Sequence, residues 1–241
     1  GRTIAVSAQS TGDFELAERT VMAALPQIEK YGNDADFDMF IDGMPANPSA
    51  VGYRRFSMVI HQGAAGRGDD RDPIAITRAL NRTALLVHDD PVGVIRLAGD
   101  ALQHSDELGL VSSAIVARGH LVNALLMVGR WEEAADIIQR HLADGRTDRL
   151  DWEAYIAVGS ALLAYGRGDR RLLAPAVPGL EESIDPVVRG WVLMPQAVGT
   201  YFAGDPRRAG ELAADAVDAI GMLGRTSEDL PLAYSLAVDM L

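Results

Sequence analysis

Between residues 105 and 143, apolar side chains recur at the three- and four-residue spacing of a buried helix face, in two successive runs. The first run comprises Leu110, Val111, Ala114, Ile115, Leu121, Leu125 and Met127, and the second comprises Ala134, Ala135, Ile137, Ile138 and Leu142. Gly129 separates the runs and suits the left-handed conformation that ends a helix. Glu132 and Glu133 then stand in a first helical turn, where the helix dipole favours carboxylates. The pattern predicts an antiparallel helical hairpin that ends at Asp144-Gly145.

The turn phrase Gly-x-Trp-x-x-Ala, from Gly129 to Ala134, has weaker counterparts elsewhere in the chain. These counterparts begin at Gly12-Asp13, Asp89-Asp90, Gly168-Asp169 and Gly204-Asp205. The phrases that begin at residues 89, 129, 168 and 204 are separated by steps of 40, 39 and 36 residues. A nearly constant period of this size is typical of stacked helix pairs, so we expect an array of such pairs.

An apolar helical face follows each of these phrases. The faces comprise Phe14, Ala17, Val21, Ala24 and Leu25; Val94, Ala98, Ala101 and Leu102; Leu172, Leu173, Val177 and Leu180; and Ala209, Leu212, Ala213, Ala216 and Val217. Pro91 and Pro206 suit the first turn of their helices, whereas Pro175 and Pro178 should shorten or kink theirs. Ala134 and Ala209 are expected where two helices cross closely.

Residues 31–72 break the regular pattern and are expected to form an irregular repeat with two polar loops. Such loops are candidate functional segments because insertions fall on the surface of a repeat array. Both ends of the chain fall within a repeat, so we expect residues 1–241 to be one array cut from a longer protein. Apolar surfaces left at those ends would favour a homodimer or an adjacent domain.

The repeated phrase resembles the tetratricopeptide (TPR) repeat at Leu125, Gly129, Trp131, Ala134, Ile138 and Leu142. Its steps of 36–40 residues exceed the usual TPR period, and in this respect the chain looks like the repeat regions of MalT-type and LuxR-type ATP-dependent bacterial transcriptional regulators. This resemblance implies an all-α fold, a right-handed α-solenoid of TPR-like helix pairs. It also implies a sensor array, with the ATPase and helix-turn-helix modules outside this chain.

The formal net charge of −12 argues against direct contact with nucleic acid or an anionic membrane surface. The chain has no cysteine, no apolar run long enough to span a membrane and no phosphate-binding Gly-x-x-x-x-Gly-Lys-Ser/Thr loop. We therefore expect a cytoplasmic domain that holds neither cofactor nor metal.

No catalytic constellation stands out in the sequence. The five histidines are scattered, and Ser160 follows Gly159 without the strand-turn-helix context of a nucleophile elbow. Carboxylates cluster at Asp34, Asp36, Asp38 and Asp42, and at Glu181, Glu182 and Asp185. Paired acids could serve a helical hydrolase, but solvated acidic loops are the favoured reading, and we expect no enzymatic activity.

Aromatic residues supply the candidate binding site. Tyr155 and Trp191 each stand thirteen residues before the glycine that ends their repeat helix, and Tyr165 and Tyr201 each stand three before it. The TPR resemblance places these four residues, together with Asn123 and Phe202, on the inner face of the array. A row of rings with polar tips suits a groove for a ligand or peptide, and packing between repeats is the alternative.

Three further residues are secondary candidates. Pro195 should kink its helix and open a pocket near Met194 and Tyr201. Arg118 and Arg189 could pair with an acidic group of a ligand, or could neutralise local carboxylates.

Taken with the resemblance, these features favour a non-enzymatic sensor domain of a LuxR/MalT-type transcriptional regulator. It would bind a protein, a peptide or a small-molecule inducer in the concave groove. The alternative is a scaffold or oligomerisation module that takes no small ligand.

Overall fold

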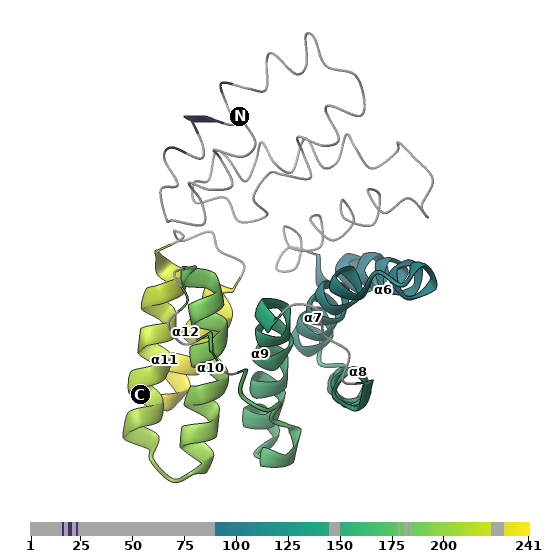
Figure 1. Cartoon of the computed structure of the whole chain (residues 1–241). Helices are drawn as coiled ribbons and strands as arrows, with labels where there is room; N and C mark the ends of the chain where they lie inside the picture. Colours follow the sequence, from purple (N-terminus) through teal and green to yellow (C-terminus); the bar gives the residue numbers. More distant parts are fainter. Residues whose placement is uncertain are drawn as a thin grey trace.

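Seven α-helices make up most of the described part of the chain (Figure 1). The computed structural model describes residues 16, 19, 20 and 23, and then 90–144, 150–177, 179–180, 183, 185–222 and 229–241. The helices are α6 (Pro91–Leu108), α7 (Val111–Met127), α8 (Trp131–Asp144), α9 (Leu150–Arg167), α10 (Pro186–Phe202), α11 (Pro206–Gly221) and α12 (Leu230–Met240), with one 3-10 turn, η1 (Arg170–Leu172). Among these residues no strand occurs, and no helix is both long and apolar enough to cross a membrane. The predicted first repeat and the irregular repeat at 31–72 lie outside the described residues, apart from four helical positions near the start.

Aspartate followed by proline begins three of the helices. Asp90 accepts a hydrogen bond from the backbone N–H of Gly93 at 2.8 Å, and Asp205 accepts one from that of Arg208 at 3.0 Å. Asp185 caps α10 in the same way. Each carboxylate satisfies an N–H that the helix leaves open, and the proline that follows has no N–H to satisfy. The predicted starts after Asp90 and Asp205 are confirmed.

The predicted glycine stop at residue 129 is also confirmed. Gly129 has φ +79°, and the next N–H, that of Arg130, donates to the Leu125 carbonyl at 2.9 Å. A side chain at this left-handed position would clash with its own backbone, so glycine fixes the turn between α7 and α8. Gly204 has φ +89° and likewise forms the turn between α10 and α11.

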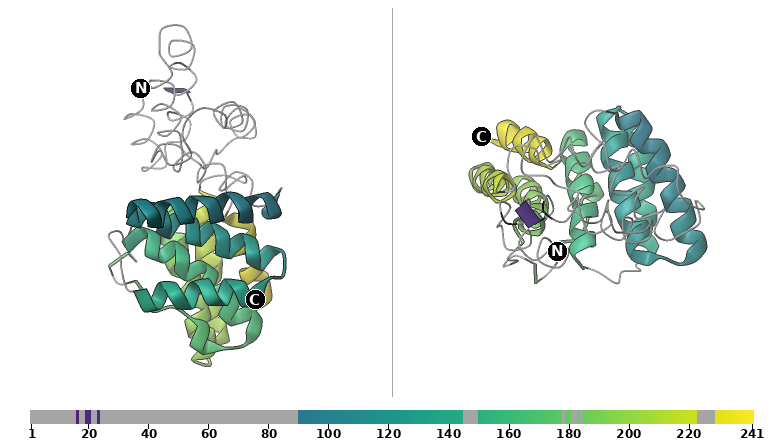
Figure 2. Two further views of the ribbon diagram at one scale, coloured as in Figure 1. Left: turned by 90° about the vertical axis from the view of Figure 1, so that its right-hand side faces the viewer. Right: turned by 90° about the horizontal axis from the view of Figure 1, so that it is seen from above.

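The helices pack mostly as sequential pairs, α6 with α7, α10 with α11, and α11 with α12. The α7–α8 hairpin forms as predicted. Contacts also run from α7 to α9, past α8, and from α9 to α10. In the left view of Figure 2, α6, α7 and α8 run across the direction of α10 and α11. The fold class is therefore all-α, and the superhelical solenoid remains a prediction.

The helix predicted after Gly168 is shortened, as Pro175 and Pro178 indicated, and more strongly than expected. It is reduced to the 3-10 turn η1, and residues 173–177 have no helical structure. Ser160 of α9 holds this segment, because its hydroxyl donates to the Leu172 carbonyl at 2.8 Å and accepts from the Ala174 N–H. Pro175 lies in the same segment and cannot donate a helical hydrogen bond.

Predicted apolar faces are confirmed where they lie away from the helix ends. Ala134 and Ala209 have no exposed surface, as expected at close helix crossings. Met127 and Leu142 were expected to be buried, but they are 39% and 41% exposed. Met127 is the last residue of α7, and Leu142 lies in the last turn of α8, where His141 is buried in its place.

Candidate functional site

Three of the predicted site residues meet in the interior between α7, α9 and α10. The Asn123 side-chain amide donates to the Tyr155 hydroxyl at 3.1 Å, and the rings of Tyr155 and Trp191 lie 4.8 Å apart between centroids. Only 3%, 2% and 7% of Asn123, Tyr155 and Trp191 is exposed. These residues therefore pack adjacent helices together, and no open surface of them is presented to a groove.

Two residues that the aromatic spacing did not single out extend this row at either end. His120 of α7 meets the Tyr155 ring edge-on, with centroids 5.4 Å apart. The Trp191 indole donates to Asp229 Oδ2 at 3.0 Å, at the start of α12. We call His120, Asn123, Tyr155, Trp191 and Asp229 the interior row. Asp229 lies two residues before Pro231, a sequence signal of a helix start, but its carboxylate turns inward and makes no cap.

Burial shifts the ionisation of both ends of the interior row. Desolvation lowers the pKa of His120 to about 4, so its ring is neutral at neutral pH. Desolvation raises the pKa of Asp229 to about 6, although the hydrogen bond from Trp191 acts in the opposite direction. Among the described residues, Asn123 Oδ1 and Asp229 Oδ1 are buried without a hydrogen-bond partner. A buried acceptor that lacks a partner costs about 1–3 kcal/mol.

The other three predicted site residues form a separate cluster near the C-terminal ends of α9 and α10. The centroids of Tyr165 and Tyr201 lie 5.2 Å apart, and those of Tyr201 and Phe202 lie 6.0 Å apart. The Tyr165 hydroxyl donates to the Asp239 carbonyl of α12 at 3.3 Å. Tyr201 is 41% exposed, whereas Tyr165 and Phe202 are half-buried. The predicted set therefore divides into an interior group and a surface group.

The pocket expected from a kink at Pro195 is not formed as predicted. Helix α10 runs without interruption through Pro195, which is buried. A hollow of about 10 Å³ adjoins Pro195, Trp191 and Ala157, but neither Met194 nor Tyr201 lines it. This volume is about that of a single water site. The hypothesis of a ligand pocket at a proline kink is therefore wrong.

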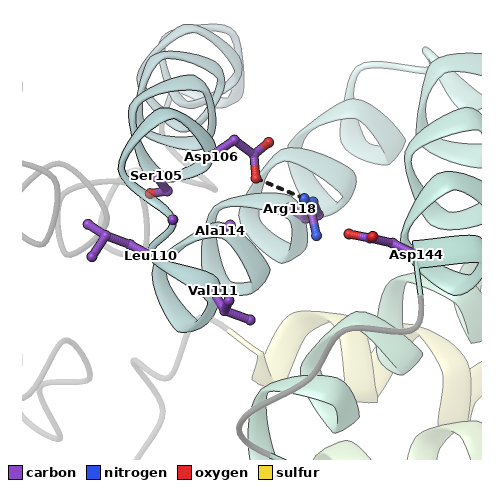
Figure 3. Close-up of a pocket in the computed structure, with 8 residues that line it drawn as sticks. Ser105, Asp106, Leu110, Val111, Ala114, Arg118 and Asp144 are labelled. Atoms are coloured by element: carbon purple, nitrogen blue, oxygen red, sulfur yellow. Dashed lines mark hydrogen bonds and ion pairs between the residues drawn. The ribbon is translucent and has the colours of Figure 1, made fainter.

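A larger polar pocket lies where α6 turns into α7, beside the end of α8 (Figure 3). Its volume is about 130 Å³, and its lining consists of Ser105, Asp106, Gly109, Leu110, Val111, Ala114, Arg118 and Asp144. Arg118 Nη2 lies 3.1 Å from Asp106 Oδ1, and in Figure 3 Asp106 and Asp144 lie on either side of the guanidinium. We call this the Arg118 pocket. The possibility that Arg118 neutralises a local carboxylate is borne out by its contact with Asp106.

Local sequence explains how the Arg118 pocket forms. Gly109 has φ +69° and reverses the chain directly after α6. Helix α7 then begins at Val111 without a side-chain cap from Leu110. Arg118 lies seven residues after Val111, almost two full turns, so it shares a helix face with the start of α7.

Two further polar side chains, on α8 and α9, hold Arg118 in place. Its Nη1 lies 3.5 Å from His141 Nδ1 of α8, and His141 Nε2 lies 2.7 Å from Glu153 Oε2 of α9. The Arg118 side chain is 15% exposed and that of His141 is 3% exposed. The guanidinium therefore has a fixed position at the wall of the pocket. Its contributors span residues 105–144 on three helices, a spread that no short motif reveals.

Within the described ranges, no group of three or more histidine, aspartate or glutamate side chains is placed to hold a metal ion. Of the predicted acidic clusters, Asp34 to Asp42, Glu181 and Glu182 lie outside the described residues, and Asp185 caps α10. Arg189 is exposed on α10.

The class that this geometry defines is an all-helical domain, whose described part comprises seven α-helices packed mostly as sequential pairs. Comparison with protein-family models, with curated proteins and with solved structures finds no match to the chain.

Proposed function

We propose that this chain is a non-enzymatic sensor domain that binds a small molecule in the Arg118 pocket. The observation that carries the proposal is the pocket itself, about 130 Å³ in volume and walled by one arginine and two aspartates. Tyr155, Trp191 and Asn123 are buried against one another, so they serve the sensor by joining its helices. Tyr165, Tyr201 and Phe202 remain candidates for a peptide contact at the surface.

The position of the pocket supports a sensing role. Its walls come from the end of α6, the start of α7 and the last residue of α8. A ligand that touched all three would favour one arrangement of these helices over others, and this differential affinity is what a switch requires. His141 and Glu153 connect the pocket wall to α9, which packs on α10.

The wider context in this proposal is a LuxR/MalT-type transcriptional regulator, with the array sensing an inducer or partner. Support comes from the TPR-like phrase and from its glycine turn, which adopts the expected left-handed conformation. The helices pack mostly as sequential pairs, which agrees with such an array. Helix α9 also contacts α7 and α10, which are the first helices of the neighbouring pairs.

A thermal-shift screen of a chemically diverse metabolite library tests the proposal. A ligand at a hundred times its Kd adds about 2.7 kcal/mol of stability, which corresponds to a rise in Tm of roughly 5–10 °C for a chain of this size. At least one compound should produce such a rise in the wild-type chain but not in Arg118→Gln. Arg96→Gln is the matched control, because Arg96 is an exposed arginine of α6 that contacts Asp100 and does not line the pocket. A library without any Arg118-dependent compound would refute the proposal.

A scaffold or oligomerisation module is the second candidate, favoured by an apolar stripe on α12. Tyr234 and Val238 are 53% and 74% exposed, and their spacing of four residues places them on one face of α12. Leu241, which is 84% exposed, directly follows the helix. This candidate predicts a homodimer in light scattering that Val238→Glu converts to a monomer. A wild-type chain that is monomeric at micromolar concentration would exclude it.

A further inference from the structure

The volume of the Arg118 pocket suits a small molecule. A cavity of about 150 Å³ in another protein accommodates benzene, so about 130 Å³ suits a ligand of roughly six non-hydrogen atoms. A ligand of that size owes its recognition to a few charged or polar groups close together.

One side of the pocket is positive. Helix α7 presents its N-terminus there, at Leu110 and Val111, and Leu110 supplies no side-chain cap. The N–H groups of a first helical turn and the helix dipole favour a negative charge at such a place. Arg118 lies on the same face, and a guanidinium has five N–H donors, which allows it to hold Asp106 and still donate to a ligand carboxylate.

The other side of the pocket is negative. Asp106 ends its side chain 3.1 Å from Arg118 with half of its surface still exposed, and Asp144 stands at the last residue of α8. Figure 3 shows the Asp144 carboxylate directed toward the guanidinium from the side opposite Asp106. A simple anion in this space would approach two carboxylates, and a simple cation would approach the arginine and the helix N-terminus. Either would meet like charge at close range, which is costly where solvent is partly excluded.

We propose that the Arg118 pocket binds a small zwitterion of the amino-acid type. Its carboxylate contacts Arg118 and the start of α7, and its ammonium group contacts Asp106 and Asp144. This assignment rests on the proposed sensor function and names its ligand class. The His141–Glu153 contact holds Arg118 in place before the ligand arrives, so little ordering of the arginine is needed on binding.

Calorimetric titration of the 241-residue chain with matched probes tests the charge requirement. Glycine, L-alanine, L-serine and β-alanine carry both charges, propionate carries only the negative one and propylammonium only the positive one. At least one zwitterion should bind at least tenfold more tightly than both single-charge probes, since only a zwitterion makes charge-assisted hydrogen bonds at both of its ends. Propionate or propylammonium binding as tightly as the best zwitterion would overturn the assignment, and so would an absence of zwitterion binding.

Variants then assign each charge to its partner. Arg118→Gln should weaken the binding of that zwitterion at least tenfold, and so should Asp144→Asn, which changes an exposed side chain and leaves the core intact. Arg96→Gln should leave the affinity unchanged. Zwitterion binding that survives Asp144→Asn undiminished would overturn the assignment even if Arg118→Gln failed to fold.

The library screen separates failure of this inference from failure of the sensor function. Arg118-dependent compounds that lack one of the two charges would refute the zwitterion class and leave the sensor function standing. A complete absence of Arg118-dependent compounds would remove both.

Discussion

Two pairs of aromatic residues stand at matched places in the sequence and have opposite surroundings in the fold. Tyr155 and Trp191 are almost fully buried, whereas Tyr201 is 41% exposed and Tyr165 is half-buried beside it. Ten residues separate the members of each helix, which is a rise of about 15 Å and a rotation of about 80° around the helix axis. The repeat period therefore fixes the position of a residue along its helix axis. Whether the residue is buried depends on which neighbouring helix packs at that position.

Trp191→Ala is expected to have the largest effect, because it removes the centre of the interior row. It would delete the ring contact with Tyr155 and the hydrogen bond to Asp229. Replacing a buried tryptophan by alanine costs about 3–5 kcal/mol. Urea denaturation followed by circular dichroism measures this loss, and a loss below about 1 kcal/mol would show that the interior row does not hold the helices together.

Asp229→Asn is expected to stabilise the chain above pH 7. The folded state raises the Asp229 pKa from 3.8 to about 6, so it favours the protonated acid, and this stability is lost as the pH rises through 6. A shift of about two units corresponds to roughly 3 kcal/mol. Unfolding free energies at pH 4.5 and pH 7.5 should show a clearly larger gain at the higher pH, because the loss begins above the unfolded-state pKa of 3.8 and is complete only above 6.

His120 supplies the internal control for that experiment. Its pKa is lowered from 6.5 to about 4, so its contribution is present above pH 6.5 and is lost as the pH falls toward 4. Once Asp229→Asn removes the opposing group, the stability of the variant should fall more steeply on acidification than that of the wild type. Parallel pH profiles would contradict the assignment of these two groups.

Ala134→Leu compares an interior position with the surface on a single helix. Ala134 has no exposed surface, and extra methylene groups in a packed core cost about 1–3 kcal/mol. Ala143→Leu, at an exposed position of the same helix α8, should change stability by about 0.5 kcal/mol or less. Chemical denaturation of both variants measures the difference, and equal effects would place Ala134 away from the helix crossing.

Tyr201→Ala is expected to have the smallest effect. It loses ring contacts with Tyr165 and Phe202 on a partly exposed surface, for which about 1 kcal/mol or less is expected. A loss as large as that of Trp191→Ala would abolish the distinction between the two aromatic pairs. Denaturation under the same conditions as for Trp191→Ala makes the two values comparable.

The sequence predicts the features of this fold that depend on local chemistry. Asp90 and Asp205 start helices because a carboxylate before proline is a cap in any context, and Gly129 ends one because its left-handed turn excludes other residues. The helix expected after Gly168 is shortened by a local cause that the sequence shows, Pro175, and the segment is held by a non-local contact that the sequence does not show. The hydroxyl of Ser160, on the preceding helix, bonds both the Leu172 carbonyl and the Ala174 N–H. A periodic pattern of apolar residues does not predict such a contact.

The candidate site follows the same division. Sequence spacing identifies Tyr155 and Trp191 as equivalent, but their burial depends on the packing of α9 against α10. The Arg118 pocket requires the end of α8 to approach the turn between α6 and α7, so Asp144 and Asp106 become neighbours of one arginine although 38 residues separate them. The pattern of charges along the sequence does not predict that these residues lie close together.

The single hydroxyl of Ser160 also has a consequence for local opening of the chain. A helix exchanges its amide hydrogens only when several successive hydrogen bonds break, whereas the Ala174 amide is protected by one bond to a side chain. The segment from Leu172 to Ala174 can therefore detach from α9 as a small unit while the helices on either side stay folded. Hydrogen exchange at Ala174 would report this local opening rather than global unfolding.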